Sequence, residues 1–394
     1  MIEDQPEIPF SKTLDSIEEL IDYCKVQELG TLSVLDIIGV KINFKIDWDS
    51  FSEDKNVKFG TINIYRSIFE YDFILPQNYK LGTIKIEQSQ FKGEFDLRGN
   101  NLSREFRLYR VWFEKKASFS DTHFNYNVEF IEVEFRELAL FLKTIFKLKL
   151  NIEKCKFYEN ATFVYSEFES LSEFREVKFN KGLDLTRIKI EGKLSFYKII
   201  LNDFETVTST STSQTLIDLN QLNIVRISND NKRETFRLIK QSLKNEGNTI
   251  DAIKYEALEQ LTHLQYLQFK LRSLEGFKQE IANYIIFGLN WLSNKNRQSW
   301  FRGVIFTLVV SFIFFGFALV STGEYEWGLC NFYNANFHEM SAYYFGAFDP
   351  FHKSAIITNK NMGPTFWTHL WLLIGRIFTA YGIYQTIAAF RKHR

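Results

Sequence analysis

Few residues in this chain have types and spacings suited to chemistry. His369 and Arg376 lie seven positions apart, which is two turns of a helix, so a helical segment would place both on one face. An arginine within an apolar segment is costly to place in lipid and should face protein or water. Two interpretations of Arg376 remain open: a pore-lining or gating charge, and a structural tie to a carbonyl or an acid in the external loop.

Other arrangements that support catalysis or metal binding are missing from the sequence. The three cysteines, Cys24, Cys155 and Cys330, have no paired spacing, so neither a disulfide framework nor a cysteine zinc site is expected. No phosphate-binding loop, nucleophile elbow or pair of catalytic carboxylates is present. His338 and His352 could bind a metal, but their spacing does not favour it. We therefore expect no enzymatic activity, no cofactor and no metal.

A repeat of 11 residues occupies residues 62 to 204, with 13 units in succession and no insertion. The third and eighth positions of the units are large and apolar, except at Lys80, which lies beside Leu81, so the spacing of the large residues alternates between five and six. Smaller residues such as Ala117, Thr122 and Val177 stand two positions earlier. A helix or an ordinary strand does not give this spacing, whereas a chain that turns a corner every five or six residues does. The alternative, a sandwich of short strands, is disfavoured by 13 gapless units.

The repeat predicts a mostly β solenoid whose stacked coils align their large side chains in columns. The predicted core includes Phe119, Phe124, Phe130, Phe135, Phe157, Phe163, Phe168, Phe174, Phe179 and Phe196.

These half-repeats resemble the pentapeptide-repeat family, in which a central Leu or Phe follows a small residue by two positions. The resemblance implies a right-handed quadrilateral β-helix with two units in each coil. One extra residue in every second half departs from the strict pattern of the family. Some soluble members mimic DNA with an acidic surface. Residues 62 to 204 hold 23 Lys+Arg and 21 Asp+Glu, a difference of +2, so neither this role nor a nucleic-acid partner is expected.

The regions outside the repeat have distinct compositions. Residues 1–61 should form an N-terminal helix and cap, and the Ser/Thr-rich residues 205–230 a linker. Apolar stripes predict a helical hairpin over 231–272. Residues 273–302 should include an interfacial helix before the membrane, because Ile281–Leu292 is too short to span. Residues 303–394 then form a membrane domain with an external loop at 321–364.

Two segments have the length of a membrane span, residues 303–320 and residues 365–390. The acidic N-terminus lacks an apolar core, so no cleavable signal peptide is expected. The resemblance to the pentapeptide-repeat family implies a location in the bacterial inner membrane, and both termini are expected in the cytoplasm because of the basic residues near the spans. These residues are Lys295, Arg297, Arg302, Arg391, Lys392 and Arg394.

The second predicted span has small residues at steps of four and three, which place them on one helix face. Such a face lets helices approach closely, within one subunit or between subunits, although chance placement is the alternative. The residues of this seam are Gly375, Thr379, Gly382, Thr386 and Ala389.

The two spans and the aromatic loop between them resemble the two-helix ion-channel module sometimes joined to pentapeptide repeats. No T-V-G-Y-G-like filter is present, so potassium selectivity does not carry over. Candidate loop residues are Asp349, Pro350 and His352. The sequence favours a cytoplasmic sensing or docking solenoid coupled to a channel-like membrane domain, which would require a homo-oligomer in the lipid bilayer. The alternative is a membrane-anchored scaffold whose solenoid binds a protein partner.

Overall fold

The computed structural model describes residues 8–23, 27–29, 32–48, 59–206, 227–272, 274–321, 344 and 365–391. The chain divides into two compact units, Met1–Gly247 and Asn248–Arg394. Gly247 has a φ of +77°, a left-handed conformation that glycine adopts without strain and that ends a helix.

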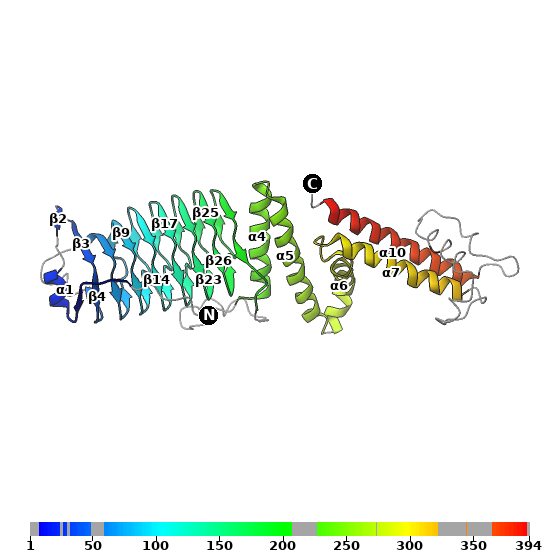
Figure 1. The fold of residues 1–394 in the computed structure, drawn as a ribbon, viewed down its shortest axis with the longest axis horizontal. Helices are drawn as coiled ribbons and strands as arrows, with labels where there is room; N and C mark the ends of the chain where they lie inside the picture. Colours follow the sequence, from blue (N-terminus) through cyan, green and yellow to red (C-terminus); the bar gives the residue numbers. More distant parts are fainter. Residues whose placement is uncertain are drawn as a thin grey trace. The chain divides into compact units, whose positions relative to one another are not determined.

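The first unit is a β-solenoid of about six turns, which confirms the repeat architecture expected from the sequence (Figure 1). Parallel strands stack so that each residue pairs with the one 22 positions further on, as Gln90 does with Trp112. Each coil therefore holds two 11-residue units and contributes strands to four sheets.

The bounds of the strands follow the repeat in all four sheets. Sheet A contains β1 (Lys12–Leu14), β4 (Val40–Ile42), β6 (Ile68–Phe69), β10 (Gln90–Phe91), β14 (Trp112–Phe113), β18 (Glu134–Phe135), β22 (Lys156–Phe157), β26 (Lys178–Phe179) and β30 (Ile200–Leu201). Sheet B contains β2 (Gln27–Leu29), β3 (Leu32–Ile38), β5 (Phe59–Tyr65), β9 (Thr83–Glu87), β13 (Phe106–Tyr109), β17 (Val128–Ile131), β21 (Leu150–Glu153), β25 (Ser172–Arg175) and β29 (Leu194–Tyr197). Sheet C contains β7 (Phe73–Ile74), β11 (Phe95–Asp96), β15 (Ala117–Ser118), β19 (Ala139–Leu140), β23 (Asn160–Thr162) and β27 (Gly182–Asp184). Sheet D contains β8 (Lys80–Leu81), β12 (Asn101–Leu102), β16 (His123–Phe124), β20 (Ile145–Phe146), β24 (Glu167–Phe168) and β28 (Lys189–Ile190).

The large residues of the repeat fill the interior, and all ten phenylalanines of the predicted core are buried. Their rings stack in columns from coil to coil. The ring of Phe141 lies 4.9 Å from that of Phe119 and 4.4 Å from that of Phe163, with interplanar angles of 7° and 1°. Burying so many aromatic side chains is the main stabilising contribution to this unit.

Each 11-residue unit turns one corner through a residue in the left-handed region. The fifth position has a positive φ in 12 of the 13 units, as at Arg110 (54°), Asp121 (53°) and Lys154 (53°). In the remaining unit the left-handed residue is Asn78, one position later. A positive φ at one central residue allows a tight turn, which keeps the inward residues on either side only five positions apart.

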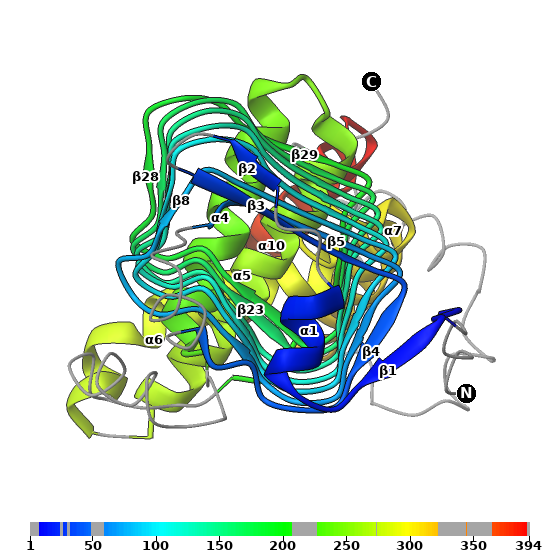
Figure 2. The ribbon, with the colours of Figure 1, turned by 90° about the vertical axis from the view of Figure 1, so that its left-hand side faces the viewer.

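Both ends of the solenoid are covered. At the N-terminal end, β2 pairs antiparallel with β3, and α1 (Ile17–Tyr23) lies over the opening of the coils, which are superposed in the view along the rod (Figure 2). At the C-terminal end, α4 (Asn229–Asn245) packs on β27 and β29. These covers protect sheet edges that would otherwise pair with other chains.

Helix α4 meets backbone groups of the last coil with its polar side chains. The Leu185 amide donates to Thr235 Oγ1 at 3.0 Å, and Ser242 Oγ donates to the Leu194 carbonyl at 2.6 Å. Asn231 Nδ2 donates to the buried Asp184 carboxylate at 2.8 Å. The cap therefore satisfies polar groups that a further coil would have paired.

The second unit is helical. Its described helices are α5 (Thr249–Lys270), α6 (Leu274–Asn294), α7 (Trp300–Val320) and α10 (Phe366–Phe390). Helices α7 and α10 form a long antiparallel hairpin, and α6 contacts α5, α7 and α10. The predicted interfacial segment is thus part of a longer helix that begins at Leu274 rather than Ile281.

Candidate functional site

The hairpin of α7 and α10 is held together by small residues. A Cβ added to Gly382 would lie 2.3 Å from Thr307 Oγ1, and one added to Gly303 would lie 2.6 Å from Thr386 Oγ1. A Cβ on Gly375 would lie 2.9 Å from the Cβ of Phe314. A larger residue at any of these points would therefore require the facing Thr or Phe to shift.

The seam predicted on the second span faces α7 of the same chain. Gly375, Thr379, Gly382 and Ala389 are buried, and Thr386 is partly buried. A matching stripe on α7, Gly303, Thr307 and Ser311, is also buried. Its spacing of four was visible in the sequence but was not recognised there as a packing face.

The outward faces of the hairpin are apolar, the reverse of a hairpin that faces water. Among the described residues, large apolar or aromatic side chains at least one-third exposed include Ile305, Leu308, Val309, Phe312, Ile313, Leu373, Ile377, Ile383, Tyr384 and Ile387. Polar and small groups are instead enclosed between the helices. The hairpin therefore hides its polar groups and presents its apolar ones.

Among the described residues, α7 is the one helix whose length and apolar composition suit a membrane crossing. Helix α10 is longer, at 25 residues against 21, but contains His369, Arg376 and Gln385. These polar residues lower its mean hydropathy relative to α7.

The two candidate functional residues of α10, His369 and Arg376, have different surroundings. Arg376 is partly buried and lines a small cavity between the helices together with Ser311, Trp371 and Thr379. His369 is exposed. The structure thus does not bring them into one site, although they are two turns apart.

A buried amide cluster joins α6 to α10. Asn294 Nδ2 donates to Gln385 Oε1 at 2.6 Å and to the Gln385 carbonyl at 3.0 Å. Asn290 Oδ1 accepts from Gln385 Nε2 at 2.8 Å and from the Tyr381 hydroxyl at 2.7 Å. Asn294 is fully buried and Gln385 nearly so. This cluster, which no sequence pattern predicts, fixes the end of α6 against α10.

An unusual turn follows the cluster. Lys295, Asn296 and Arg297 have φ values of 53°, 56° and 70°, so three consecutive non-glycine residues are left-handed. The turn is supported by the Arg297 amide, which donates to Asn294 Oδ1 at 2.8 Å. An ion pair of 3.3 Å between Arg297 and Glu256 connects it to α5. Backbone strain of this kind persists only where surrounding contacts hold it.

The charged side chains of the solenoid form ion pairs between neighbouring coils. Ten ion pairs among the described residues join positions that are 22 apart, such as Arg110 with Glu132 at 2.7 Å and Lys156 with Glu134 at 3.0 Å. Each residue of such a pair lies directly above its partner. The balanced charge therefore forms ladders along the rod and does not create a field of one sign.

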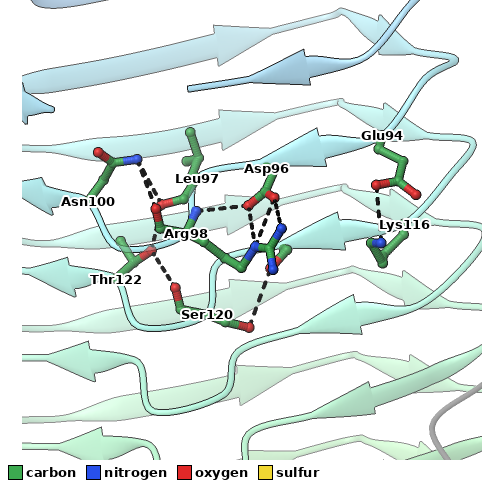
Figure 3. Close-up of polar contacts among 9 residues, drawn as sticks. Glu94, Asp96, Leu97, Arg98, Asn100, Lys116, Ser120 and Thr122 are labelled. Carbon is green, nitrogen blue, oxygen red and sulfur yellow. Dashed lines mark hydrogen bonds and ion pairs between the residues drawn. The ribbon is translucent and has the colours of Figure 1, made fainter. Parts of the chain in front are cut away.

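A polar cluster on the early coils has the same structural character (Figure 3). The buried Asp96 carboxylate accepts from Arg98 Nε at 2.9 Å, and from one of the terminal guanidinium nitrogens at 2.6 Å. Thr122 Oγ1 donates to the Leu97 carbonyl at 2.9 Å, and Asn100 Nδ2 donates to the same carbonyl at 3.1 Å. These groups satisfy one another, so the cluster gives no catalytic arrangement.

One stretch of the solenoid differs from the charged ladders. Leu140, at the end of β19, and Leu142, in the turn that follows, flank the inward Phe141 in the sequence. They form a separate hydrophobic cluster with Leu138 and Val164, and all four are buried.

No group of three or more potential metal ligands occurs among the residues that the structure describes. The loop candidates Asp349, Pro350 and His352 lie outside the described residues, as do Cys24 and His338. Cys155 is fully buried within the repeat, and burial raises the pKa of its thiol to about 12. It is therefore a packing residue and not a nucleophile.

Comparison with protein-family models, with curated proteins and with solved structures finds no match to this chain.

Proposed function

We propose that this chain is an integral membrane protein in which α7 and α10 cross the bilayer and carry the β-solenoid as a docking domain. The observation that carries the proposal is the inverted polarity of the hairpin, with Gly303, Thr307 and Gly382 inside and Ile313, Phe312 and Ile377 outside. Full burial of a side chain of this size contributes about 1.5–3 kcal/mol, and these side chains, which are roughly half exposed, would forgo about half of that in water. In lipid the same arrangement is favourable, because helices there pack through small residues.

The polar residues of α10 are compatible with this placement. Arg376 faces the cavity between the helices, and Gln385 is engaged by Asn290 and Asn294. Polar groups within a membrane are tolerated when protein satisfies them. His369 lies in the first turn after Thr365, where a helix end would meet the interface.

The basic residues beside both spans support an orientation with the solenoid and both termini in the cytoplasm. The bacterial inner membrane is proposed from the resemblance of the repeat to the pentapeptide-repeat family. The stacked four-sheet coils support a right-handed quadrilateral β-helix of the pentapeptide-repeat type. On this proposal the rod offers a rigid surface to a protein partner, with its mixed charges already paired along the rod.

The hairpin geometry favours an anchor over a pore. The small-residue seam is used within one chain, and the outward residues of the described parts of α7 and α10 give no polar stripe that could line a channel between subunits. A channel-like role stays as the second candidate, because Arg376 beside Ser311 and Thr379 places a charge within the hairpin.

An exchange of the membrane domain tests the first proposal. Residues 274–394 are replaced by an unrelated two-helix anchor, and partner capture by the solenoid is compared with that of the full chain. Equal capture of the partner by the exchanged chain and the full chain supports the proposal that the membrane domain acts only as an anchor. Loss of function in the exchanged chain, together with ion currents from the reconstituted full chain that Arg376→Ala alters, would support the channel instead.

A soluble version of the same test should end at Gly247 and not earlier. Helix α4 covers the last coil through Thr235 and Ser242, so its removal would expose a sheet edge. A chain of residues 1–247 that remains soluble and binds the same partner as the full chain would support a docking role for the solenoid.

A further inference from the structure

One end of the helical hairpin combines exposed aromatic and basic side chains. The bond between Asn294 and Gln385 brings the α6–α7 turn to the C-terminal part of α10, and the Trp300 ring stacks on Phe390 with centroids 5.0 Å apart. We call this surface the basic-aromatic end. It consists of Trp291, Lys295, Trp300, Phe301, Arg302, Phe390 and Arg391.

Few acidic residues lie near this surface in the sequence to neutralise its positive charge. The sequence contains no Asp or Glu from 281 to 323 and none from 350 to 394. Arg297 is paired with Glu256, but within the described part of the chain no ion pair involves Lys295, Arg302 or Arg391. The basic-aromatic end is therefore a local cationic region in a chain whose total charge is zero.

Arg302 is placed where a helix disfavours a cation. It lies in the first turn of α7, next to the positive end of the helix dipole, and that turn contains no acidic residue. Its guanidinium group lies 5.5 Å from the centroid of the Trp291 ring. An anion bound beside Arg302 would offset the repulsion from both the dipole and the neighbouring charges.

The surrounding residues indicate which anion fits. Trp291, Trp300, Phe301 and Phe390 are each between 39% and 59% exposed and stand beside the cations. Aromatic rings of this kind prefer the boundary between headgroups and acyl chains. A nucleic acid or a phosphopeptide would match the charge but would leave Phe301 and the neighbouring Leu292 in water. A lipid headgroup with an attached acyl chain matches both.

Given the proposed membrane crossing, on which this inference rests, we propose that the basic-aromatic end binds the phosphate groups of anionic phospholipids. Lys295, Arg302 and Arg391 contact the headgroups, while the aromatic rings lie against the upper acyl chains. The chain thereby selects anionic over zwitterionic lipid at one side of the membrane.

The test uses the full chain reconstituted into vesicles that contain equal amounts of phosphatidylglycerol and phosphatidylcholine. Electron paramagnetic resonance with spin-labelled forms of each lipid gives their relative association constants at the protein surface. The wild-type chain should prefer phosphatidylglycerol. In the triple variant Lys295→Gln, Arg302→Gln and Arg391→Gln, the ratio of the association constants for phosphatidylglycerol and phosphatidylcholine should fall about fivefold for each charge that contributes. Strong salt should reduce the preference of the wild-type chain as well, independently of how the variant folds.

The triple variant Lys143→Gln, Lys147→Gln and Lys154→Gln is the matched control, since it removes the same charge from exposed positions of the solenoid. It should keep the wild-type preference. Equal association of both lipids with the wild-type chain, or equal loss in the two variants, would overturn the inference. Alkaline extraction separates this failure from that of the proposed function: a chain that resists extraction but shows no preference refutes only the lipid site. A chain released by alkali refutes both.

Discussion

Asn294 and Gln385, 91 positions apart in the sequence, are joined by a hydrogen bond of 2.6 Å from Nδ2 to Oε1, and both side chains are buried. The bond fixes the end of α6, and with it the left-handed turn at Lys295–Arg297, to the last turns of α10. It therefore holds the turn between α6 and α7 against the C-terminal part of α10.

A double-mutant cycle on this pair measures the strength of the connection. Asn294→Ala and Gln385→Ala should each lower stability by about 1–3 kcal/mol, because each leaves a buried amide without its partner. Thermal unfolding of the full chain in detergent should show that the double variant loses less than the sum of the two. Asn283→Ala, at an exposed position of α6, is the control and should change little. Strict additivity of the two single effects would show that the pair is not coupled.

The close approach of α7 and α10 predicts a steep dependence on side-chain size at Gly382. Gly382→Leu should separate the helices, since even a Cβ would lie 2.3 Å from Thr307 Oγ1. Overpacking of this kind costs about 1–3 kcal/mol or more. Gly288→Leu in α6 is the matched control, because nothing lies within 4 Å of a Cβ built there. Equal melting temperatures of the two variants would refute the observed seam.

The left-handed corners of the solenoid predict that a glycine there is beneficial. Lys154 has a φ of 53°, and a side chain in that conformation costs about 1–2 kcal/mol relative to glycine. Lys154→Gly should therefore be neutral or stabilising despite the greater freedom of glycine in the unfolded chain. Lys147→Gly, at an exposed position without a positive φ, should destabilise by about 0.5–1 kcal/mol. Denaturant unfolding of both variants gives the comparison, and the opposite order would contradict the turn geometry.

The stability of the solenoid should depend on pH through Asp184, a buried carboxyl that the cap on the last coil contacts. Burial raises the pKa of this carboxyl above its ordinary value of 3.8, despite hydrogen bonds from Thr186 and Asn231 that favour the charged form. Because the folded state disfavours the ionised group, stability should fall as pH rises from 3.8 through the raised pKa, and should recover on acidification. The difference in unfolding free energy between the wild-type chain and Asp184→Asn isolates this effect. A difference that does not vary with pH would exclude it.

Most of the fold that could be predicted from the sequence was predicted from the 11-residue repeat. A bulky residue at every fifth and then sixth position predicted a solenoid with buried columns such as Phe119 and Phe163, and the resemblance to the pentapeptide-repeat family implied two units, or 22 residues, in each coil. Helices α4 and α5 followed from apolar stripes and from the break at Gly247, and α7 and α10 followed from the length of their apolar segments. Local signals of this kind need no knowledge of distant contacts.

Features that depend on distant or conformational information were missed. Most of the left-handed corners are occupied by ordinary polar residues such as Arg110 and Lys154, and among the 12 fifth-position corners only Gly99 and Asp121 have the types that favour this conformation. The amide cluster unites residues of α6 and α10 that have no sequence relationship. Similarly, a small-residue stripe was recognised on α10, but its partner on α7 was hidden within a strongly apolar segment.

Reactivity of a thiol at the outer face of α7 tests the central claim most directly. Ile313 is 40% exposed in the hairpin and Leu148 is 41% exposed on the solenoid, so protein shields them equally. Ile313→Cys and Leu148→Cys are compared in a chain without other cysteines, using N-ethylmaleimide on intact membranes. The reagent needs a thiolate, which lipid suppresses and water permits. We predict rapid labelling at position 148 and almost none at position 313, whereas equal labelling at both would show that α7 lies in water.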